Sequence, residues 1–343
     1  MKRQAVYFTG EGTVEVREEP ITSPEKGEVM VQALLSGISP GTESLIYYNR
    51  VSEESQVDPT ISSLNGSFSY PLKYGYCMVG KIIDTGREVD KSWLGRKVFS
   101  FHPHESLFNV KPEDLIALPE TLSVEDAVFF ANMETAVSLL MDGRPLIGEC
   151  VGIFGQGIVG LLTAALLVRF PIGLLLTLDF HELRRKRSME LGADYSIDPV
   201  TSDSMAYTKH LLHQQGNVDG FDLTYELTGD PKALNQAASA TGYEGRVIIG
   251  SWYGTRTAPL EFGTQFHRSK IQLFSSQVSH LRSELTGRWN KERRGDFTVR
   301  MLTEIRPSGF ITHNFPVDQA SGAYNQLINN PGETLQITFN YDS

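Results

Sequence analysis

The sequence is poor in cysteine and has no long uninterrupted hydrophobic run. Its 343 residues contain only Cys77 and Cys150, which excludes a disulfide framework and favours a reducing compartment. The most apolar stretch, residues 161–178, is broken by an arginine, a proline and a glycine, whereas a membrane span needs about 20 apolar residues. The first residues, MKRQAVYFTGEG, lack the apolar segment of a signal peptide. We therefore expect a cytoplasmic protein with no membrane association.

Basic residues are also in the minority. The chain has 31 lysines and arginines against 41 aspartates and glutamates, a net charge of −10. Proteins that bind nucleic acid usually carry a basic face, so this balance argues against a nucleic-acid partner. We expect a small-molecule substrate instead.

The first 120 residues predict short β-strands separated by turns. AVYF, TVEVRE and MVGKIID have the length and periodicity of strands, and turn or loop residues such as SPEKG, SPGTE and DTGRE separate them. From Thr121 onward, helical and strand patterns alternate, which is typical of a parallel sheet with helices on both faces. The predicted fold class is therefore α/β, with a β-rich region followed by a doubly wound parallel sheet.

The strongest motif lies in VGIFGQGIVGLL, residues 151–162, where three glycines give G-x-G-x-x-G between a predicted strand and a predicted helix. The first glycine permits a tight turn, the second lets the backbone approach a pyrophosphate, and the third lets helix meet strand. Amide groups at the start of the helix can then face the phosphates. The candidate cofactor-binding residues here are Gly155, Gln156, Gly157, Ile158, Val159 and Gly160.

An acidic residue at the end of the next strand indicates which dinucleotide is bound. Asp179 lies 19 residues after Gly160, where a carboxylate can accept both ribose hydroxyls of NAD and repel the 2′-phosphate of NADP. The basic residues 184–187 could instead pair with a 2′-phosphate. On a helix they point in different directions, and Asp179 would lie closer to the ribose. We expect NAD, with NADP as the less favoured cofactor.

The carboxyl edge of the predicted sheet supplies further cofactor-binding candidates. Thr228 and Gly229 end one strand, and Gly250 and Ser251 end the next. Dinucleotides lie along this edge, so these residues are expected to line the nicotinamide half.

Other polar and aromatic segments have two open interpretations each. The aromatic residues Tyr47, Tyr48, Trp252 and Tyr253 could wall a substrate pocket or lie in the core. The basic stretch 287–296, GRWNKERRGD, suits a solvated turn or a clamp for an acidic substrate. His102 and His104 share a strand face, as metal ligands can, but no third ligand lies nearby, which favours histidines with ordinary hydrogen-bond partners.

Several segments together resemble the medium-chain dehydrogenase/reductase superfamily. They are GISPGTE, YGYCMVGKIIDTG, DFHELRRKRSMELGAD, FDLTYELTG, GRVIIG and the ending FPVDQASGAYNQLINNPGETLQITF, so the resemblance covers almost the whole chain. It implies a GroES-like catalytic domain in residues 1–131, a Rossmann dinucleotide-binding domain in 132–278, and a return to the catalytic domain in 279–343. It also implies that Arg184 packs over the adenine and that the strand KIQLFSSQ joins two sheets in a homodimer.

Many members of this superfamily hold a catalytic zinc through a cysteine, a histidine and a third cysteine or glutamate. The positions in this chain are occupied by Ser39 or Pro40, by Tyr76 and by Asn132, none of which is a usual zinc ligand. Residues 46–73 contain no cysteine, so the structural zinc lobe is missing as well. The chain therefore resembles a zinc-independent branch, with likeness to bacteriochlorophyllide dehydrogenases and quinone reductases, and no bound metal is expected.

Without zinc, hydroxyl or imidazole donors must polarise the carbonyl group. Tyr76 occupies a vacated ligand position, where its phenol can hydrogen-bond the substrate oxygen. Thr42 matches a residue that relays protons in zinc-containing relatives, and Glu134, at a helix start, is a candidate general base. Each of these three could also be a structural residue.

The function expected from the sequence is hydride transfer between NAD(H) and an alcohol/carbonyl substrate by a zinc-independent oxidoreductase. One alternative is an NADPH-dependent quinone or enone reductase. A second, non-enzymatic alternative is a nucleotide-binding redox-sensing protein without turnover.

Overall fold

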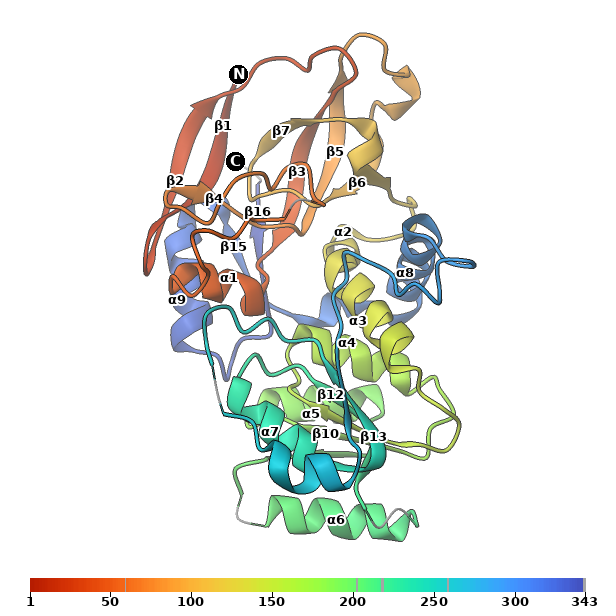
Figure 1. Ribbon diagram of the computed structural model, residues 1–343. Helices are drawn as coiled ribbons and strands as arrows, with labels where there is room; N and C mark the ends of the chain where they lie inside the picture. Colours follow the sequence, from red (N-terminus) through yellow and green to blue (C-terminus); the bar gives the residue numbers. More distant parts are fainter. Residues whose placement is uncertain (59, 202, 217–218, 258, 342–343) are drawn as a thin grey trace. The chain divides into compact units, whose positions relative to one another are not determined.

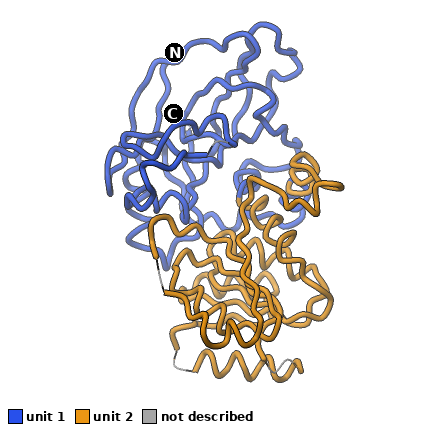
Figure 2. The backbone as a smooth tube through the Cα atoms, viewed as in Figure 1, with its two compact units in different colours: residues 1–131, 299–343 blue, residues 132–298 orange. Residues whose placement is uncertain are grey.

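The protein, described here from a computed structural model, forms two compact units (Figure 2). The structure describes residues 1–58, 60–201, 203–216, 219–257 and 259–341. Unit 1 comprises Met1–Ala131 and Val299–Ser343, and unit 2 comprises Asn132–Thr298. The sequence analysis also divided the chain after residue 131, but it assigned residues 279–298 to the C-terminal return. The structure groups those residues with unit 2.

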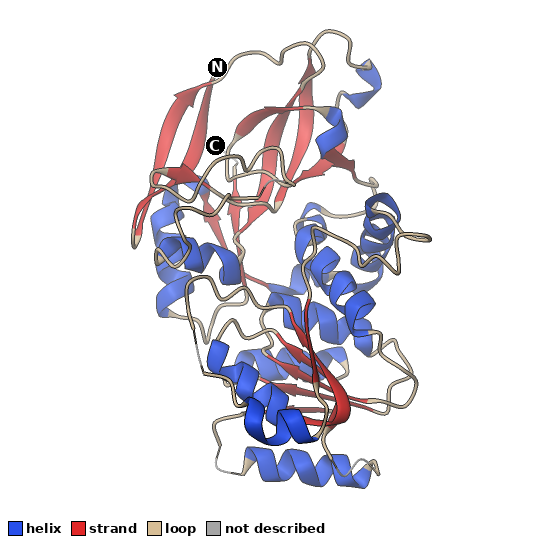
Figure 3. Cartoon of the chain, viewed as in Figure 1, coloured by secondary structure: helices blue, strands red, loops and turns tan. Residues whose placement is uncertain are grey.

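Unit 1 is built on two sheets (Figures 1 and 3). The larger sheet has the order β15-β16-β3-β5-β6-β8, with β7 paired to β3, and the smaller has the order β2-β1-β4. C-terminal β16 pairs antiparallel with β3, which brings the end of the chain into the N-terminal sheet. The strands are Lys2–Gly10 (β1), Thr13–Pro20 (β2), Val29–Gly37 (β3), Leu72–Lys73 (β4), Met78–Thr85 (β5), Lys97–Ser100 (β6), Leu107–Val110 (β7), Leu115–Ala117 (β8), Ile311–Pro316 (β15) and Gln336–Asn340 (β16).

Three α-helices complete unit 1: Pro40–Tyr47 (α1), Val124–Ala127 (α2) and Ala320–Asn329 (α9). The segment GISPGTE was expected to be a loop, but Pro40 opens α1, because proline suits the first helical turn. Tyr47 at its end stacks on Tyr324, with ring centroids 6.0 Å apart, in the same apolar cluster as Phe8. Tyr47 is therefore a core residue.

Unit 2 contains a six-stranded parallel sheet in the order β11-β10-β9-β12-β13-β14. The chain runs outward from β9 in both directions, so a topological switch lies between β9 and β12, where doubly wound folds bind ligands. This confirms the predicted α/β class, with the strands Cys150–Phe154 (β9), Leu174–Leu178 (β10), Tyr195–Ile197 (β11), Phe221–Glu226 (β12), Thr241–Ile249 (β13) and Gln272–Ser275 (β14).

Helices cover both faces of this sheet because its central strands are apolar on both sides. Every residue of β9 and β10 is buried. The helices of this part of the chain are Phe130–Gly143 (α3), Ile158–Leu167 (α4), Glu182–Leu191 (α5), Ser204–Gln214 (α6), Pro231–Ala240 (α7) and Lys291–Ile305 (α8), of which residues 130–131 of α3 and 299–305 of α8 belong to unit 1. Because α8 begins at Lys291, much of the stretch 287–296 is helical rather than a turn. Among the residues that the structure describes, no helix has both the length and the apolar character that crossing a bilayer demands.

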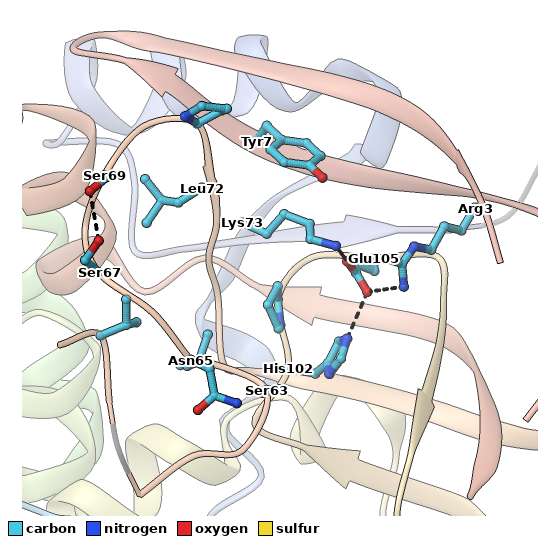
Figure 4. A pocket seen from close by; sticks show the side chains of 14 residues that line it. Arg3, Tyr7, Ser63, Asn65, Ser67, Ser69, Leu72, Lys73, His102 and Glu105 are labelled. Atoms are coloured by element: carbon cyan, nitrogen blue, oxygen red, sulfur yellow. Dashed lines mark hydrogen bonds and ion pairs between the residues drawn. The ribbon is translucent and has the colours of Figure 1, made fainter. Parts of the chain in front are cut away.

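A buried ion cluster joins β1, β4 and the segment before β7 in unit 1 (Figure 4). The Glu105 carboxylate, only 2% exposed, accepts hydrogen bonds from Arg3 at 2.8 Å and from His102 Nε2 at 2.9 Å, and Lys73 Nζ lies 2.5 Å away. The His102 ring stacks on Phe108, with centroids 3.8 Å apart. A hollow of about 440 Å³ lies beside the cluster. His102 thus has a structural partner, as the sequence analysis favoured.

Glu105 should make the stability of unit 1 sensitive to acid. Burial raises its pKa, but the His102 hydrogen bond and the charges of Lys73 and Arg3 outweigh burial and bring the pKa from 4.5 to about 2. A carboxylate with a depressed pKa stabilises the fold fully above its unfolded value, and this contribution is lost as the pH falls from about 4.5 to 2. Glu105→Gln should remove this acid-dependent component of the unfolding free energy, of the order of 3 kcal/mol.

Urea unfolding at about pH 6 and pH 3 measures this component. Glu113, whose side chain is 76% exposed, provides the control variant Glu113→Gln, which should behave like the wild type. An unchanged difference between the two pH values in Glu105→Gln would contradict the assignment.

Candidate functional site

The glycine turn between β9 and α4 has the geometry of a phosphate cradle. Gly155 has φ +92°, and a side-chain Cβ there would lie 2.7 Å from the carbonyl oxygen of Leu227. A Cβ on Gly160 would lie 2.0 Å from the carbonyl oxygen of Gly155. A Cβ on Gly157 would meet no atom within 4 Å. The outer two glycines are therefore required by packing, whereas Gly157 leaves open space where a phosphate can approach.

The residues around Gly157 divide into two roles. Ile158 is the first residue of α4, so its amide and that of Val159 belong to the helix N-terminus, which favours anions. Gln156 differs, because its amide N–H donates to Asp179 Oδ2 at 2.8 Å and its buried side chain donates to the Gly155 carbonyl at 3.0 Å. In this structure Gln156 ties the turn to Asp179 instead of presenting its amide to a phosphate.

Asp179 follows β10 directly, at the carboxyl edge beside the turn. It is 6% exposed, and its Oδ1 accepts the His181 amide at 2.8 Å. Arg184 Nη1 lies 3.6 Å from Oδ2, and Arg185 Nη1 donates to the Asp179 carbonyl at 2.9 Å. Residues 184–187 were predicted to point in different directions from their helix. Arg184 lies near the buried Asp179 carboxylate, which attracts cations, whereas Arg185 bonds the main-chain carbonyl of Asp179 and pairs with Asp198.

The ends of β12 and β13 are connected by hydrogen bonds. The Gly229 amide donates to Ser251 Oγ at 2.9 Å, and the Gly250 amide donates to the Glu226 carbonyl at 3.0 Å. Thr228 donates through its amide to the Glu226 carboxylate at 2.9 Å. The structure therefore brings the predicted residues Thr228, Gly250 and Ser251 together. The sequence analysis missed Glu226, although an acid inside the apolar strand FDLTYE was a detectable signal.

In unit 1, three hydroxyl groups meet at the predicted catalytic tyrosine. Tyr76, just before β5, is hydrogen-bonded to Ser39 Oγ and to Thr42 Oγ1, the latter at 3.1 Å. Burial is the main cause that raises the pKa of Tyr76, and Cys77 adds to the effect, whereas the two hydroxyl hydrogen bonds oppose it. The phenol therefore stays protonated at neutral pH and can act as a hydrogen-bond donor.

A buried acid holds the segment that carries two of these hydroxyl groups. Glu43, in the first turn of α1, is fully buried and accepts the Ser39 amide at 2.6 Å and the Tyr324 hydroxyl. His104 Nε2 lies 3.2 Å from the second oxygen of Glu43, and His104 Nδ1 lies 2.6 Å from Ser36 Oγ. Neither Glu43 nor this role of His104 was predicted, because the contact joins residues 61 apart in the sequence.

The donor set of this cluster does not fit a zinc ion. Ser39 and Tyr76 stand where relatives place two ligands, and zinc prefers thiolate, imidazole or carboxylate. The two hydroxyls bond each other, and the phenol stays protonated. Burial also raises the pKa of the neighbouring Cys77 thiol. Within the described ranges, no three histidine, cysteine, aspartate or glutamate side chains are grouped to hold a metal.

Glu134, the candidate general base, pairs with an arginine from the basic stretch 287–296. Arg294 is 2% exposed, and its Nη2 donates to Glu134 Oε1 at 2.9 Å. Its Nη1 donates to Ser138 Oγ at 3.1 Å and to the Val278 carbonyl at 2.8 Å. This corrects both interpretations of the basic stretch at Arg294, and it explains why residues 279–298 belong to unit 2. Glu134 has a structural partner instead of the free carboxylate that a general base requires.

Comparisons with known proteins agree with this geometry. No protein-family model matches the sequence. The (R,R)-butanediol dehydrogenase of Bacillus subtilis is 24% identical over 228 residues, which span 59% of this chain and 62% of that relative. The solved structure of an alcohol dehydrogenase from Escherichia coli CFT073 in complex with NADH aligns with a TM-score of 0.78, at 16% identity over 99% of both chains.

A second solved structure, named as a zinc-binding dehydrogenase of Sinorhizobium meliloti 1021 and bound to NADP, aligns with a TM-score of 0.77. It is 17% identical and covers 99% of this chain and 100% of its own. In sequence and in fold, the chain is similar to dehydrogenases of the medium-chain type. The likeness confirms the predicted fold, a GroES-like β-rich region with a Rossmann sheet, while the superfamily and its zinc-independent branch stay predictions. One of these two solved structures is bound to NADH and the other to NADP, so the fold does not decide between the cofactors.

The Glu134–Arg294 pair should be essential for the stability of unit 2. Arg294→Met leaves a buried carboxylate without its cation, which costs about 3–5 kcal/mol of unfolding free energy. The exposed neighbour Arg293 provides the control variant Arg293→Met, with a loss below about 1 kcal/mol. Chemical denaturation measures both. A double variant, Glu134→Leu with Arg294→Met, should be more stable than Arg294→Met alone, and the reverse order would contradict the ion-pair interpretation.

Asp179 should select the cofactor. Asp179→Ala and Asp179→Asn should weaken NAD binding and reduce the preference for NAD over NADP, because the ribose loses its acceptor and the 2′-phosphate loses its repulsion. Calorimetric titration with both cofactors measures the change, and Glu190→Ala, on the exposed side of α5, is the control. Unchanged affinities for both cofactors would show that the ribose binds elsewhere.

Proposed function

We propose that this protein is an NAD-dependent, zinc-independent dehydrogenase or reductase acting on an alcohol/carbonyl pair. One observation carries the proposal: the glycine turn leaves an open position at Gly157, and Asp179 lies beside it at the same edge of the sheet. Relatives named as butanediol, threonine and sorbitol dehydrogenases support the reaction class. Because the match to the first of these spans only 62% of the relative, the activity and substrate remain part of the proposal.

The nicotinamide, when bound, supplies or accepts the hydride. The amides at the start of α4 bind the pyrophosphate, and Asp179 accepts the ribose hydroxyls. In the direction of reduction, the Tyr76 O–H donates to the carbonyl oxygen and transfers its proton as the alcohol forms. Thr42 or Ser39, each hydrogen-bonded to the phenol, relays a proton from solvent water to the phenolate and takes up the water's proton as it gives its own. In the direction of oxidation the same groups carry the alcohol proton away.

An NADPH-dependent quinone or enone reductase is the second candidate. Arg184 and Arg185 both lie against Asp179, and these cations could bind a 2′-phosphate if the aspartate turned away. The non-enzymatic alternative, a redox-sensing protein, follows only from the replaced zinc ligands. The hydroxyl cluster at Tyr76 argues against it, because cofactor sensing alone requires no such donors.

A homodimer is also part of the proposal. Strand β14 lies at the edge of the six-stranded sheet, and its free side can pair with the same strand of a second copy. Two exposed aromatic residues lie nearby in the chain, Tyr243 on β13 and Phe262 before β14. Cytoplasmic location remains a prediction from the low cysteine content.

A substrate screen tests the proposed reaction. Alcohols, ketones and quinones are offered with NAD(H) and NADP(H), and absorbance at about 340 nm reports nicotinamide turnover. Oxidation of an alcohol with NAD, by protein that elemental analysis shows to be free of zinc, is the expected result. Quinone reduction with NADPH would favour the second candidate. Cofactor binding without turnover of any substrate would favour the non-enzymatic alternative.

Removal of the Tyr76 hydroxyl should impair chemistry more than binding. Tyr76→Phe should lower kcat by about 10²–10⁴-fold, the usual contribution of one positioned acid, with little change in cofactor affinity. Tyr70→Phe is the control, because the Tyr70 hydroxyl bonds to main-chain groups, among them the carbonyl of Ile46. A retained kcat in Tyr76→Phe would return the phenol to a structural role.

A further inference from the structure

Glu226 is a fully buried acid at the last position of β12. One carboxylate oxygen accepts the Thr228 amide at 2.9 Å and also the Thr228 hydroxyl. The other oxygen accepts the Tyr253 hydroxyl. One side chain therefore connects the segment that follows β12 with the segment that follows β13.

The backbone of Glu226 makes the same connection. Its carbonyl accepts the Gly250 amide at 3.0 Å and the Ser251 hydroxyl at 3.3 Å. Ser251 Oγ in turn accepts the Gly229 amide at 2.9 Å. The loops that start at Thr228 and at Gly250 are thus fixed to one residue through both its side chain and its main chain.

This residue lies next to the glycine turn. In the parallel pairing of β12 with β9, Glu226 is opposite Phe154, which directly precedes Gly155. The Leu227 carbonyl lies 2.7 Å from where a Gly155 Cβ would be. The switch point of the sheet falls between these two strands. The two loops therefore occupy the part of the carboxyl edge where the nicotinamide half of a dinucleotide lies.

We propose that Glu226 is a positioning residue for the nicotinamide half of the cofactor, acting through the two loops that it joins. This inference rests on the proposed function. The carboxylate does not contact the cofactor: it holds Thr228–Gly229 and Gly250–Tyr253 in one arrangement, so that their backbone groups meet the nicotinamide without rearrangement. The adenosine half, bound at Asp179, lies outside its influence.

The chemistry of the site requires a carboxylate and not an amide. The Thr228 amide can only donate, and both hydroxyls already donate to Glu226. Burial and the negative charge of Glu226 raise the pKa of Tyr253, so its phenol keeps the proton that it donates. A glutamine has one acceptor oxygen, so its NH₂ group would face either Thr228, whose amide can only donate, or Tyr253, whose hydroxyl would have to accept where it now donates. Glu226→Gln therefore removes the charge-assisted hydrogen bond to one of the two loops while it preserves the side-chain volume.

The test compares two ligands that differ only by the nicotinamide base. Calorimetry measures the binding of NADH and of ADP-ribose to the wild type and to Glu226→Gln. We expect about tenfold weaker binding of NADH, the usual consequence of leaving a buried donor without its acceptor, and an ADP-ribose affinity within about twofold of the wild type. Tyr253→Phe, which removes one donor but keeps the carboxylate, should change NADH binding in the same direction by a smaller factor.

Glu244→Gln is the matched control, since Glu244 lies on β13 in an exposed pair with Lys270 and should leave both affinities unchanged. Equal loss of NADH and ADP-ribose binding, or no loss of either, would overturn the inference, because a purely structural role does not separate the two ligands. If Glu226→Gln does not fold, the affinities of Tyr253→Phe for NADH and ADP-ribose alone test the inference. A wild-type protein that binds neither ligand would overturn the proposed function, and this inference with it.

Discussion

The close approach of backbone segments at Gly155 and Gly160 is the constraint on which the cofactor site depends. A side chain on Gly155 would collide with the main chain of Leu227, and a side chain on Gly160 would collide with the main chain of Gly155. The turn can therefore enter α4 only as it does, with an open position at Gly157. The amide of Gln156, between Gly155 and Gly157, donates to the Asp179 carboxylate, and this hydrogen bond fixes the turn to the end of β10. The strand ends, the turn and the acid form one rigid edge of unit 2.

In both units, buried acids organise loops that carry the functional groups. Glu43 fixes the start of α1, from which Ser39 and Thr42 reach Tyr76. Glu226 fixes the loops after β12 and β13. A buried carboxylate is costly unless several donors satisfy it, so each acid requires a defined arrangement of the segments around it. A set of hydroxyl donors held in this way can position a substrate oxygen by hydrogen bonds, the task that a metal ion performs in zinc-containing relatives.

Local sequence patterns predicted much of the fold and the local geometry of the candidate cofactor site. The parallel sheet, the glycine turn and Asp179 follow from periodicity and spacing within a few tens of residues, and the structure has all three. The patterns failed where a contact joins distant segments. Arg294 looked solvated within its basic stretch, but it is buried on Glu134, 160 residues away. Glu43 and His104 form their contact only once β-strands of unit 1 are assembled. Helix α1 was missed because the proline in GISPGTE was taken as a loop residue, although proline also begins helices.

The central claim is that a nicotinamide dinucleotide binds on the glycine turn without help from a metal ion. Calorimetric titration of NADH into chelator-treated protein, with zinc content checked on the same sample, tests it most directly. The account predicts saturable heat with one NADH per chain at negligible zinc. The absence of heat with both NADH and NADPH, or binding that returns only when zinc is restored, would contradict it.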